Sequence, residues 1–296
     1  MFDAPKSPYL VPSDGSFDFD AAPTTPPDGT PGKKKLKEQL AESTERLADL
    51  QRILYAHDRH SLLLIFQALD AAGKDSTIRH VFSGVDPAGF QVSSFKQPSA
   101  EELDHDFLWR SARRLPERGR IGIFNRSYYE EVLVVRVHPE YLDNQKLHLA
   151  LDDADDLDQL WRHRFESIRD HEKHLTRNGT VVVKFFLHVS LDEQKRRFLS
   201  RLDEPHKHWK FSAGDVRERG FRDAYMHAYA EMLNATSSMA APWYAIPADD
   251  KPFMRATVAD LVVRTLESLD LHYPEVDPNE KARFDEMRAI LDDEPT

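Results

Sequence analysis

Cysteine is absent from the 296 residues of the chain, which excludes disulfide bonds, thiolate metal sites and cysteine nucleophiles. Long apolar runs are missing too, because the longest one, Leu62–Phe66, falls far below the roughly 20 residues of a membrane span. The first residues carry neither the basic start nor the apolar stretch of a secretory signal. We therefore expect a cytoplasmic protein without a membrane partner.

The chain also lacks an excess of positive charge. It has 40 Lys and Arg residues against 51 Asp and Glu, so its formal net charge is −11. A chain with this balance repels polyanions as a whole, so we expect no nucleic-acid partner. An anionic substrate would have to be attracted by a local cluster of basic residues. The 40% of hydrophobic residues are enough for a packed interior.

Prolines are concentrated at the start of the chain, where seven of the 18 lie within residues 1–32. Such a segment cannot form a helix or a central strand. Two alternatives remain for this Pro-rich arm. The first, slightly favoured, is disorder. The second is an extended arm laid over the domain or over a neighbouring subunit, with Phe17 and Phe19 as anchors.

After the arm, helical and strand-like segments alternate. Leucines recur at helical spacing over residues 33–57, among charged residues. Strand-like runs follow at Ser61–Gln67, Gln91–Phe95, Arg120–Asn125, Thr180–Val189 and Trp243–Ile246, with helical patterns at Glu102–Leu115, Asp156–Arg177 and Leu191–Leu202. This alternation predicts an α/β fold in which helices cover both faces of a parallel sheet. Residues 276–296 are expected to form a terminal helix or a tail.

The segment from Leu62 to Ile78 has the order strand, tight loop, helix that a phosphate-binding loop requires. Gly73 would let the backbone approach an anion, successive amides would bind it, and Lys74 would supply positive charge. The standard Walker A pattern is not met in full. Gln67 or Ala68 stands near the position where the first glycine belongs, and Asp75 follows the lysine where a hydroxyl residue is expected. The alternative is an ordinary strand–loop–helix junction with a surface lysine.

Asp70 lies inside this loop, where a carboxylate among anion-binding amides is electrostatically unfavourable unless a cation or proton offsets it. Asp70 is therefore a candidate Mg²⁺ ligand, or a group that orients a phosphate acceptor. A capping role within the loop is the alternative.

A series of motifs in order resembles the family 2 polyphosphate kinases over about residues 35–270. The motifs are Asp70–Asp75, Ser83–Gly89, Phe95–Pro98, Leu115–Gly119, Phe124–Glu130, Arg201–Pro205, Lys207–Ser212, Ala241–Tyr244 and Ile246–Lys251. The resemblance implies a three-layer α/β/α P-loop kinase fold over residues 33–275, with a helical lid around residues 191–235. It also implies Mg²⁺-dependent phosphoryl transfer between inorganic polyphosphate and nucleotides, with Mn²⁺ as an alternative metal.

The resemblance also assigns roles to residues. It makes Asp70, Lys74, Arg126, Glu130 and Arg201 candidate catalytic residues, with Asp70 and Glu130 as metal ligands. Candidate phosphate-binding residues are Ala71, Ala72, Gly73, Lys74, Asp75, Ser76, Asn125, Lys207 and Lys210. A glutamate at position 130 makes the chain resemble the subgroup of the family that phosphorylates both nucleoside mono- and diphosphates. AMP and ADP are therefore both expected acceptors. The alternatives are a surface arginine at 126 and a helix-start glutamate at 130.

Basic residues gather near position 200. Arg197 and Arg201 are four residues apart, so they share a helix face that either clamps phosphates or is simply solvated. Candidates for lining a polyphosphate channel are Arg79, Lys96, Arg113, Arg114 and Arg118. Trp209 and Trp243 are expected to be packing residues, although an aromatic near the lid could instead stack on a nucleobase.

These observations favour a reversible polyphosphate kinase that converts AMP and ADP to ADP and ATP by direct in-line transfer. Adenine nucleotides are the expected partners, with guanine nucleotides left open, and the resemblance suggests a homodimer or homotetramer. Two alternatives remain. One is an ATP-dependent nucleotide or small-molecule kinase, and the other is a nucleotide-binding protein without catalysis.

Overall fold

A parallel sheet of five strands forms the centre of the computed structural model, which describes residues 2–147 and 154–294. The strands lie in the order β2-β3-β1-β4-β5. They are β1 (Ser61–Gln67), β2 (Phe90–Ser94), β3 (Ile121–Asn125), β4 (Thr180–His188) and β5 (Trp243–Pro247). Each predicted strand is confirmed, with ends that differ by a residue at most.

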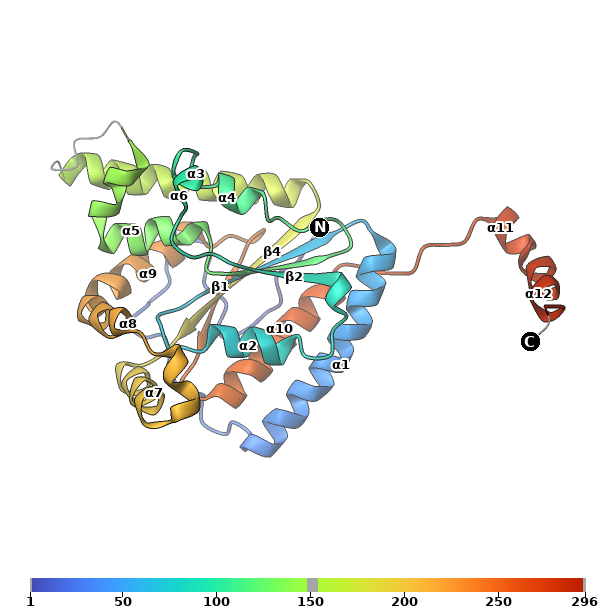
Figure 1. The fold of residues 1–296 in the computed structure, drawn as a ribbon, viewed down its shortest axis with the longest axis horizontal. Coiled ribbons are helices and arrows are strands. Elements are labelled where there is room, and N and C mark those ends of the chain that lie inside the picture. The colour runs from blue at the N-terminus through green and yellow to red at the C-terminus, as the bar shows by residue number, and fades with distance from the viewer. Residues whose placement is uncertain (1, 148–153, 295–296) are drawn as a thin grey trace.

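Helices cover both faces of this sheet. The α-helices of the described residues are α1 (Lys33–His57), α2 (Lys74–Val81), α3 (Ala100–Leu103), α4 (Trp109–Ala112), α5 (Val134–Val137), α6 (Ala154–Arg177), α7 (Leu191–Asp203), α8 (Ala213–Glu218), α9 (Arg222–Thr236), α10 (Lys251–Glu267), α11 (Pro278–Ala282) and α12 (Phe284–Asp292). Helices α1, α2 and α10 lie on one face, and α6 and α9 lie on the other (Figure 1).

The central strand β1 is apolar at nearly every position because both of its faces are covered. Its side chains alternate between the two layers. Leu62, Leu64 and Phe66 belong to the core cluster with α1, α2 and α10, whereas Leu63 and Ile65 belong to the cluster with α6 and α9. The predicted three-layer α/β/α fold with a parallel sheet is therefore confirmed.

The Pro-rich arm lies on the domain, so the slightly favoured expectation of disorder is corrected. Leu10 forms an antiparallel bridge with Tyr244, and the Val11 amide donates to the Trp243 carbonyl at 2.9 Å. Phe19 is buried, with its ring centroid 5.7 Å from that of Phe186. The arm thus covers β5 at the edge of the sheet, where backbone groups would otherwise lack partners.

A single helix over residues 102–115 was expected, and the structure contains two short ones, α3 and α4. A capping box between Ser99 and Glu102 starts α3. Between the two helices, the Asp106 carboxylate accepts a hydrogen bond from the Leu108 amide at 2.9 Å. This local turn competes with the helical hydrogen bonds, so the helix does not continue.

The last two helices, α11 and α12, project away from the body of the protein on an extended segment (Figure 1). The apolar side chains of Phe284, Ile290 and Leu291 on α12 are exposed. None of the helices in the described residues is both long and apolar enough to cross a membrane.

A buried ion pair lies in the layer of α6 and α9. The Lys184 ammonium of β4 lies 2.6 Å from the Glu172 carboxylate of α6, and it also donates to the Tyr129 hydroxyl and the Thr236 carbonyl, both at 2.9 Å. The hydroxyls of Tyr128 and Tyr129 both donate to the other oxygen of the Glu172 carboxylate, at 2.9 and 2.7 Å. The network fixes the two tyrosines that lie between Arg126 and Glu130.

We predict that Glu172→Gln lowers the free energy of unfolding by about 3 kcal/mol or more, because it leaves the Lys184 ammonium buried without a counter-charge. The matched control is Glu267→Gln, which removes an exposed ion pair with Arg46 and should cost less than about 1 kcal/mol. Urea unfolding of the two variants measures both values. Equal losses would contradict this account.

Candidate active site

The loop between β1 and α2 occupies residues 68–73 at the carboxyl end of the central strand. Ala71 and Gly73 have φ values of 62° and 109°, in the left-handed region. Within the described residues these are the loop's only positive φ angles, so Ala68 has an ordinary backbone conformation. An alanine at the place of the usual glycine is therefore compatible with this turn.

Lys74, at the start of α2, is buried, so the alternative of a surface lysine is wrong. Its ammonium donates to the Ala68 carbonyl at 2.8 Å. Burial lowers the pKa of Lys74, and the nearby Arg126 lowers it further, while Asp70 opposes the shift. A cation held by a neutral carbonyl beside the loop amides leaves a positive field that suits an anion.

Arg126 follows β3 directly and adopts a left-handed conformation, with φ of 64°. Its amide donates to the Phe66 carbonyl of β1 at 3.1 Å. Its guanidinium reaches Asp70 at 2.8 Å and Glu130 at 3.2 Å. Glu130 chiefly, and Asp70 as well, raise the pKa of Arg126 against the effect of burial. Three of the predicted catalytic residues therefore meet at the ends of neighbouring parallel strands, where α/β proteins bind ligands.

Asn125 ends β3 and pairs with the residue that departs from the Walker A pattern. Its side-chain amide donates to the Asp75 carboxylate at 2.6 Å. The carboxylate thus stands on α2 and the neutral amide on β3, whereas the common arrangement has a hydroxyl after the lysine and a carboxylate at the strand end. The hydrogen bond between Asn125 and Asp75 still connects β3 to the start of α2, directly after the phosphate loop.

A cavity of about 280 Å³ opens beside these residues. Its polar lining comes from Asp70, Arg126, Glu130, His138, Gln194, Asp215, Glu218, Arg219, Arg222, Tyr225 and Tyr229. The carboxyl ends of the strands supply the first three, and α7 to α9 supply most of the others. The predicted lid segment therefore forms one wall of the cavity.

Two tyrosines in this wall keep their protons. Burial raises the pKa of Tyr225, and so does its hydrogen bond to Glu218 at 2.8 Å. Burial and the nearby Glu130 raise the pKa of Tyr229 well above its ordinary value. His138 Nε2 lies 2.9 Å from the same Glu218 carboxylate. Both phenols can therefore donate hydrogen bonds at neutral pH.

The remaining basic candidates lie outside this cavity. Arg201 contacts Asp215 at 3.2 Å and the Lys210 carbonyl at 3.1 Å. Lys207 donates to Ser200 at 2.8 Å. The Lys210 ammonium lies 4.8 Å from the centre of the Trp209 ring. That ring is 78% exposed, so the interpretation of Trp209 as a packing residue is wrong, whereas Trp243 is buried as expected.

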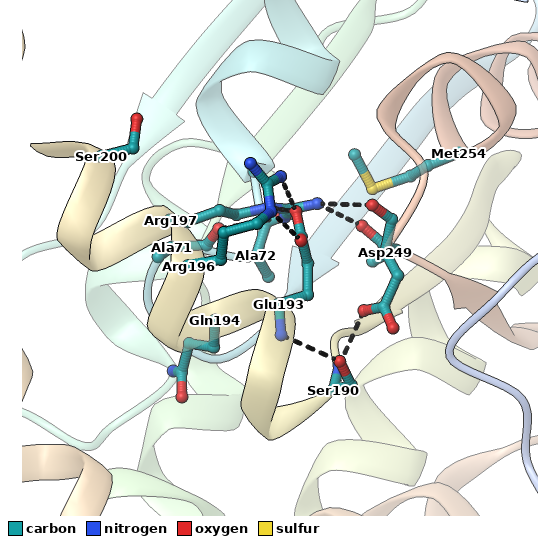
Figure 2. A network of polar contacts seen from close by, with 12 residues as sticks. Ala71, Ala72, Ser190, Glu193, Gln194, Arg196, Arg197, Ser200, Asp249 and Met254 are labelled. Carbon is teal, nitrogen blue, oxygen red and sulfur yellow. Dashed lines mark hydrogen bonds and ion pairs between the residues drawn. The ribbon is translucent and has the colours of Figure 1, made fainter.

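Arg197 does not share an open face with Arg201, because its guanidinium is buried beneath the phosphate loop (Figure 2). The Glu193 carboxylate accepts from its Nε at 2.6 Å. Its other acceptors are the carbonyls of Ala71 at 3.1 Å, Ala72 at 2.6 Å, Ala248 at 2.6 Å and Asp249 at 3.2 Å. Helix α7 is thereby fastened to both the phosphate loop and the turn after β5.

Two carboxylates of the cavity are candidates for holding the implied divalent metal. Asp70 and Glu130 face one cavity with side chains 26% and 16% exposed. Among the described residues, no group of three or more His, Cys, Asp or Glu could hold a metal by itself. Mg²⁺ needs no such cage, because it is commonly bound by one or two carboxylates together with water and substrate phosphates. The two carboxylates therefore fit a Mg²⁺ ion shared with substrate.

Several cavity residues were not predicted from the sequence. Arg222, Tyr225 and Tyr229 follow one another at intervals of three and four residues, so they share a face of α9. This spacing was visible in the sequence. Arg219 and His138 carried no comparable signal, because only the folding of the chain brings the short 3-10 helix Arg219–Phe221 and the residue after α5 to the same cavity.

Comparison with known proteins identifies close relatives of this chain. The family model described as polyphosphate kinase 2 matches residues 31–274. An ADP-polyphosphate phosphotransferase of Rhodopseudomonas palustris is 55% identical over 88% of this chain and 89% of its own. An AMP/ADP-polyphosphate phosphotransferase of Meiothermus ruber is 43% identical over 90% and 95%. The crystal structure of polyphosphate kinase 2 from Arthrobacter aurescens TC1 superposes with a TM-score of 0.86 at 39% identity, covering 99% of each chain.

We predict that Arg197→Lys lowers the free energy of unfolding by about 3 kcal/mol, because a single ammonium cannot reach all the buried carbonyls and each unsatisfied one costs about 1–3 kcal/mol. The neighbouring Arg196 contacts Glu193 from a largely exposed position. Arg196→Lys is therefore the control and should change stability by less than about 0.5 kcal/mol. Chemical denaturation distinguishes the two, and similar values would show that the buried contacts are not stabilising.

Proposed function

This chain belongs to the polyphosphate kinase 2 family, and from that membership we propose that it transfers phosphoryl groups reversibly from inorganic polyphosphate to ADP and AMP. The observation that carries the proposal is the guanidinium of Arg126 held between Asp70 and Glu130, next to the phosphate loop. An anion in the loop and an acceptor in the adjoining cavity would meet at this guanidinium. The printed names of the relatives support ADP and AMP as acceptors.

The reaction needs no covalent enzyme intermediate. An ionised oxygen on the terminal phosphate of the acceptor attacks the last phosphorus of the polyphosphate chain and forms a new P–O bond. The bond from that phosphorus to the bridging oxygen breaks, and the chain leaves one phosphate shorter with the electron pair on that oxygen. Catalysis of such a transfer consists mainly of positioning and charge stabilisation.

The residues divide these tasks. The amides of residues 71–76 and the Lys74 ammonium would bind the donor phosphates. Arg126 would stabilise the charge that develops on the transferred group. Asp70 would orient the acceptor phosphate. Asp70 and Glu130 would hold a divalent ion, Mg²⁺ or alternatively Mn²⁺, which neutralises phosphate oxygens when bound.

The lid residues enter the proposal through their contacts. Arg201, a candidate catalytic residue from the family resemblance, would act by positioning Asp215, which lines the cavity. Lys207 and Lys210, in the 3-10 helix Pro205–Lys210 that follows α7, remain candidate phosphate ligands. We also propose cytoplasmic location, assembly into a homodimer or homotetramer, and a division into the arm, the kinase domain of residues 33–275 and the terminal segment.

We predict that purified protein supplied with Mg²⁺, polyphosphate and AMP forms both ADP and ATP, followed by chromatography. Lys74→Met should reduce both products by at least about a hundredfold, because it removes the cation at the loop. Unchanged turnover in that variant would contradict the phosphate-loop assignment. Transfer from ATP but not from polyphosphate would favour an ATP-dependent kinase. Folded protein that transfers nothing would favour a binding protein.

We predict that Glu130→Gln reduces kcat/KM for AMP by about tenfold more than for ADP. AMP is held through a single phosphate, so its position depends more on the cavity floor that Glu130 and Arg126 build. Losing one charged hydrogen bond typically costs about 1.5–3 kcal/mol. Initial rates with each acceptor at saturating polyphosphate give the ratio. An equal loss for both acceptors would assign Glu130 to the transfer step and not to acceptor choice.

A further inference from the structure

His188 is the last residue of β4, and the Pro-rich arm covers its ring. The ring centroid of Phe19 in the arm lies 5.2 Å from that of His188, and the Phe186 ring lies 5.3 Å from it on the same strand. His188 is buried by this packing. The arm therefore reaches the carboxyl end of a central strand, where α/β proteins bind ligands.

The surroundings keep the His188 imidazole neutral. Burial chiefly, and the charge of Arg222 as well, lower the pKa of His188 to about 4. Asp249 and the arm's backbone at Ala22 and Pro23 oppose this shift. One nitrogen of a neutral imidazole donates a hydrogen bond and the other accepts one. At neutral pH the ring therefore offers one acceptor nitrogen inside the protein.

Arg222 offers a donor to the same region. Its Nη2 donates to the carbonyl of Val189, the residue after His188, at 3.0 Å. In the part of the chain that the structure describes, Nη1 of Arg222 and Nδ1 of His188 are both buried without a partner. A guanidinium nitrogen only donates, and Nδ1 accepts when the ring proton is on Nε2. The two groups are therefore complementary, either directly or through one water molecule.

Arg222 connects this pair to the cavity beside the phosphate loop. It begins α9 and lines the cavity. Among the described residues Arg222 forms no salt bridge, whereas Arg126 already engages Asp70 and Glu130. The charge of Arg222 is therefore available to an anionic group that enters the cavity.

Resting on the proposed function, we propose that His188, held by the arm, positions Arg222 to bind a phosphate group of the acceptor nucleotide. Nδ1 of the ring accepts a hydrogen bond from the guanidinium, and Phe19 keeps the ring in place. His188 is a positioning residue, because it does not itself line the cavity. The arm thus contributes to acceptor binding, beyond covering the edge of the sheet.

The first test separates the hydrogen bond of Nδ1 from the packing of the ring. His188→Phe keeps a ring and removes both nitrogens, whereas the side-chain oxygen of His188→Asn can take the place of Nδ1. His188→Phe should raise KM for AMP and ADP about tenfold, because a lost charge-assisted hydrogen bond is worth about that factor. Its kcat and its KM for polyphosphate should change by less than about twofold. His188→Asn should restore most of the lost affinity for AMP.

The second test asks whether the ring acts through the guanidinium. Arg222→Met should raise KM for AMP by at least about tenfold, and adding His188→Phe should then have no further effect. Phe19→Ala should raise the same KM about threefold. The control is His57→Phe at the amino end of the sheet, where another Nδ1 is buried without a partner in the described residues and burial lowers the pKa of the ring. It should change none of these values.

Equilibrium binding of AMP without polyphosphate is measured in the same proteins, so the inference is decided even where no transfer occurs. Wild-type protein that binds AMP but transfers nothing overturns the proposed function alone. Additive losses in the double variant overturn the inference, as does His188→Phe binding AMP as tightly as wild type. An equal loss in His188→Asn and His188→Phe assigns the ring a packing role and also overturns it. Wild-type protein that does not bind AMP overturns both.

Discussion

The site depends on the ion pairs that Arg126 forms with Asp70 and Glu130. These three charges come from the ends of β1 and β3, which pair in parallel through Leu64 and Ile123. The register of the two strands therefore sets the distance between the phosphate loop and the guanidinium. Without Arg126, two carboxylates would face each other across the cavity, and their repulsion would oppose the fold. The left-handed backbone at Arg126 is a strained conformation, which packed surroundings must hold in place.

The surroundings hold it from two directions. From the α6 layer, the ion pair of Lys184 and Glu172 fixes Tyr129, just before Glu130. From the lid segment, Arg197 binds the carbonyls on the underside of the phosphate loop (Figure 2). The buried carbonyls of Ala71 and Ala72 thereby find hydrogen-bond donors, which holds the loop in one conformation. The buried cations of Lys184 and Arg197 thus serve the geometry of the site. Each donates hydrogen bonds to buried oxygen atoms that water cannot reach.

The sheet was predictable because short apolar runs such as Leu62–Phe66, alternating with helical segments, are typical of parallel strands buried between two layers of helices. The loop residues and Arg126 were predictable because each belongs to a motif that lies at the end of a predicted strand, β1 for the loop and β3 for Arg126. Arg197 was not, because helical spacing shows which residues share a face but not which partner that face meets. The arm was misjudged for a related reason. Its composition suits disorder, yet the pairing of Leu10 with Tyr244 depends on an edge strand more than 200 residues away.

Overall charge and local charge act differently in this protein. With a net charge of −11, long-range repulsion works against any polyanion, and screening limits it to about 10 Å at ordinary salt. Binding of a phosphate chain must then be decided by contacts at short range, for which the loop amides, Lys74 and Arg126 are the proposed groups. Because the carboxylates of the cavity engage Arg126 directly, a phosphate bound at this guanidinium would compete with them. A divalent cation held by Asp70 and Glu130 would neutralise these carboxylates and so relieve that competition.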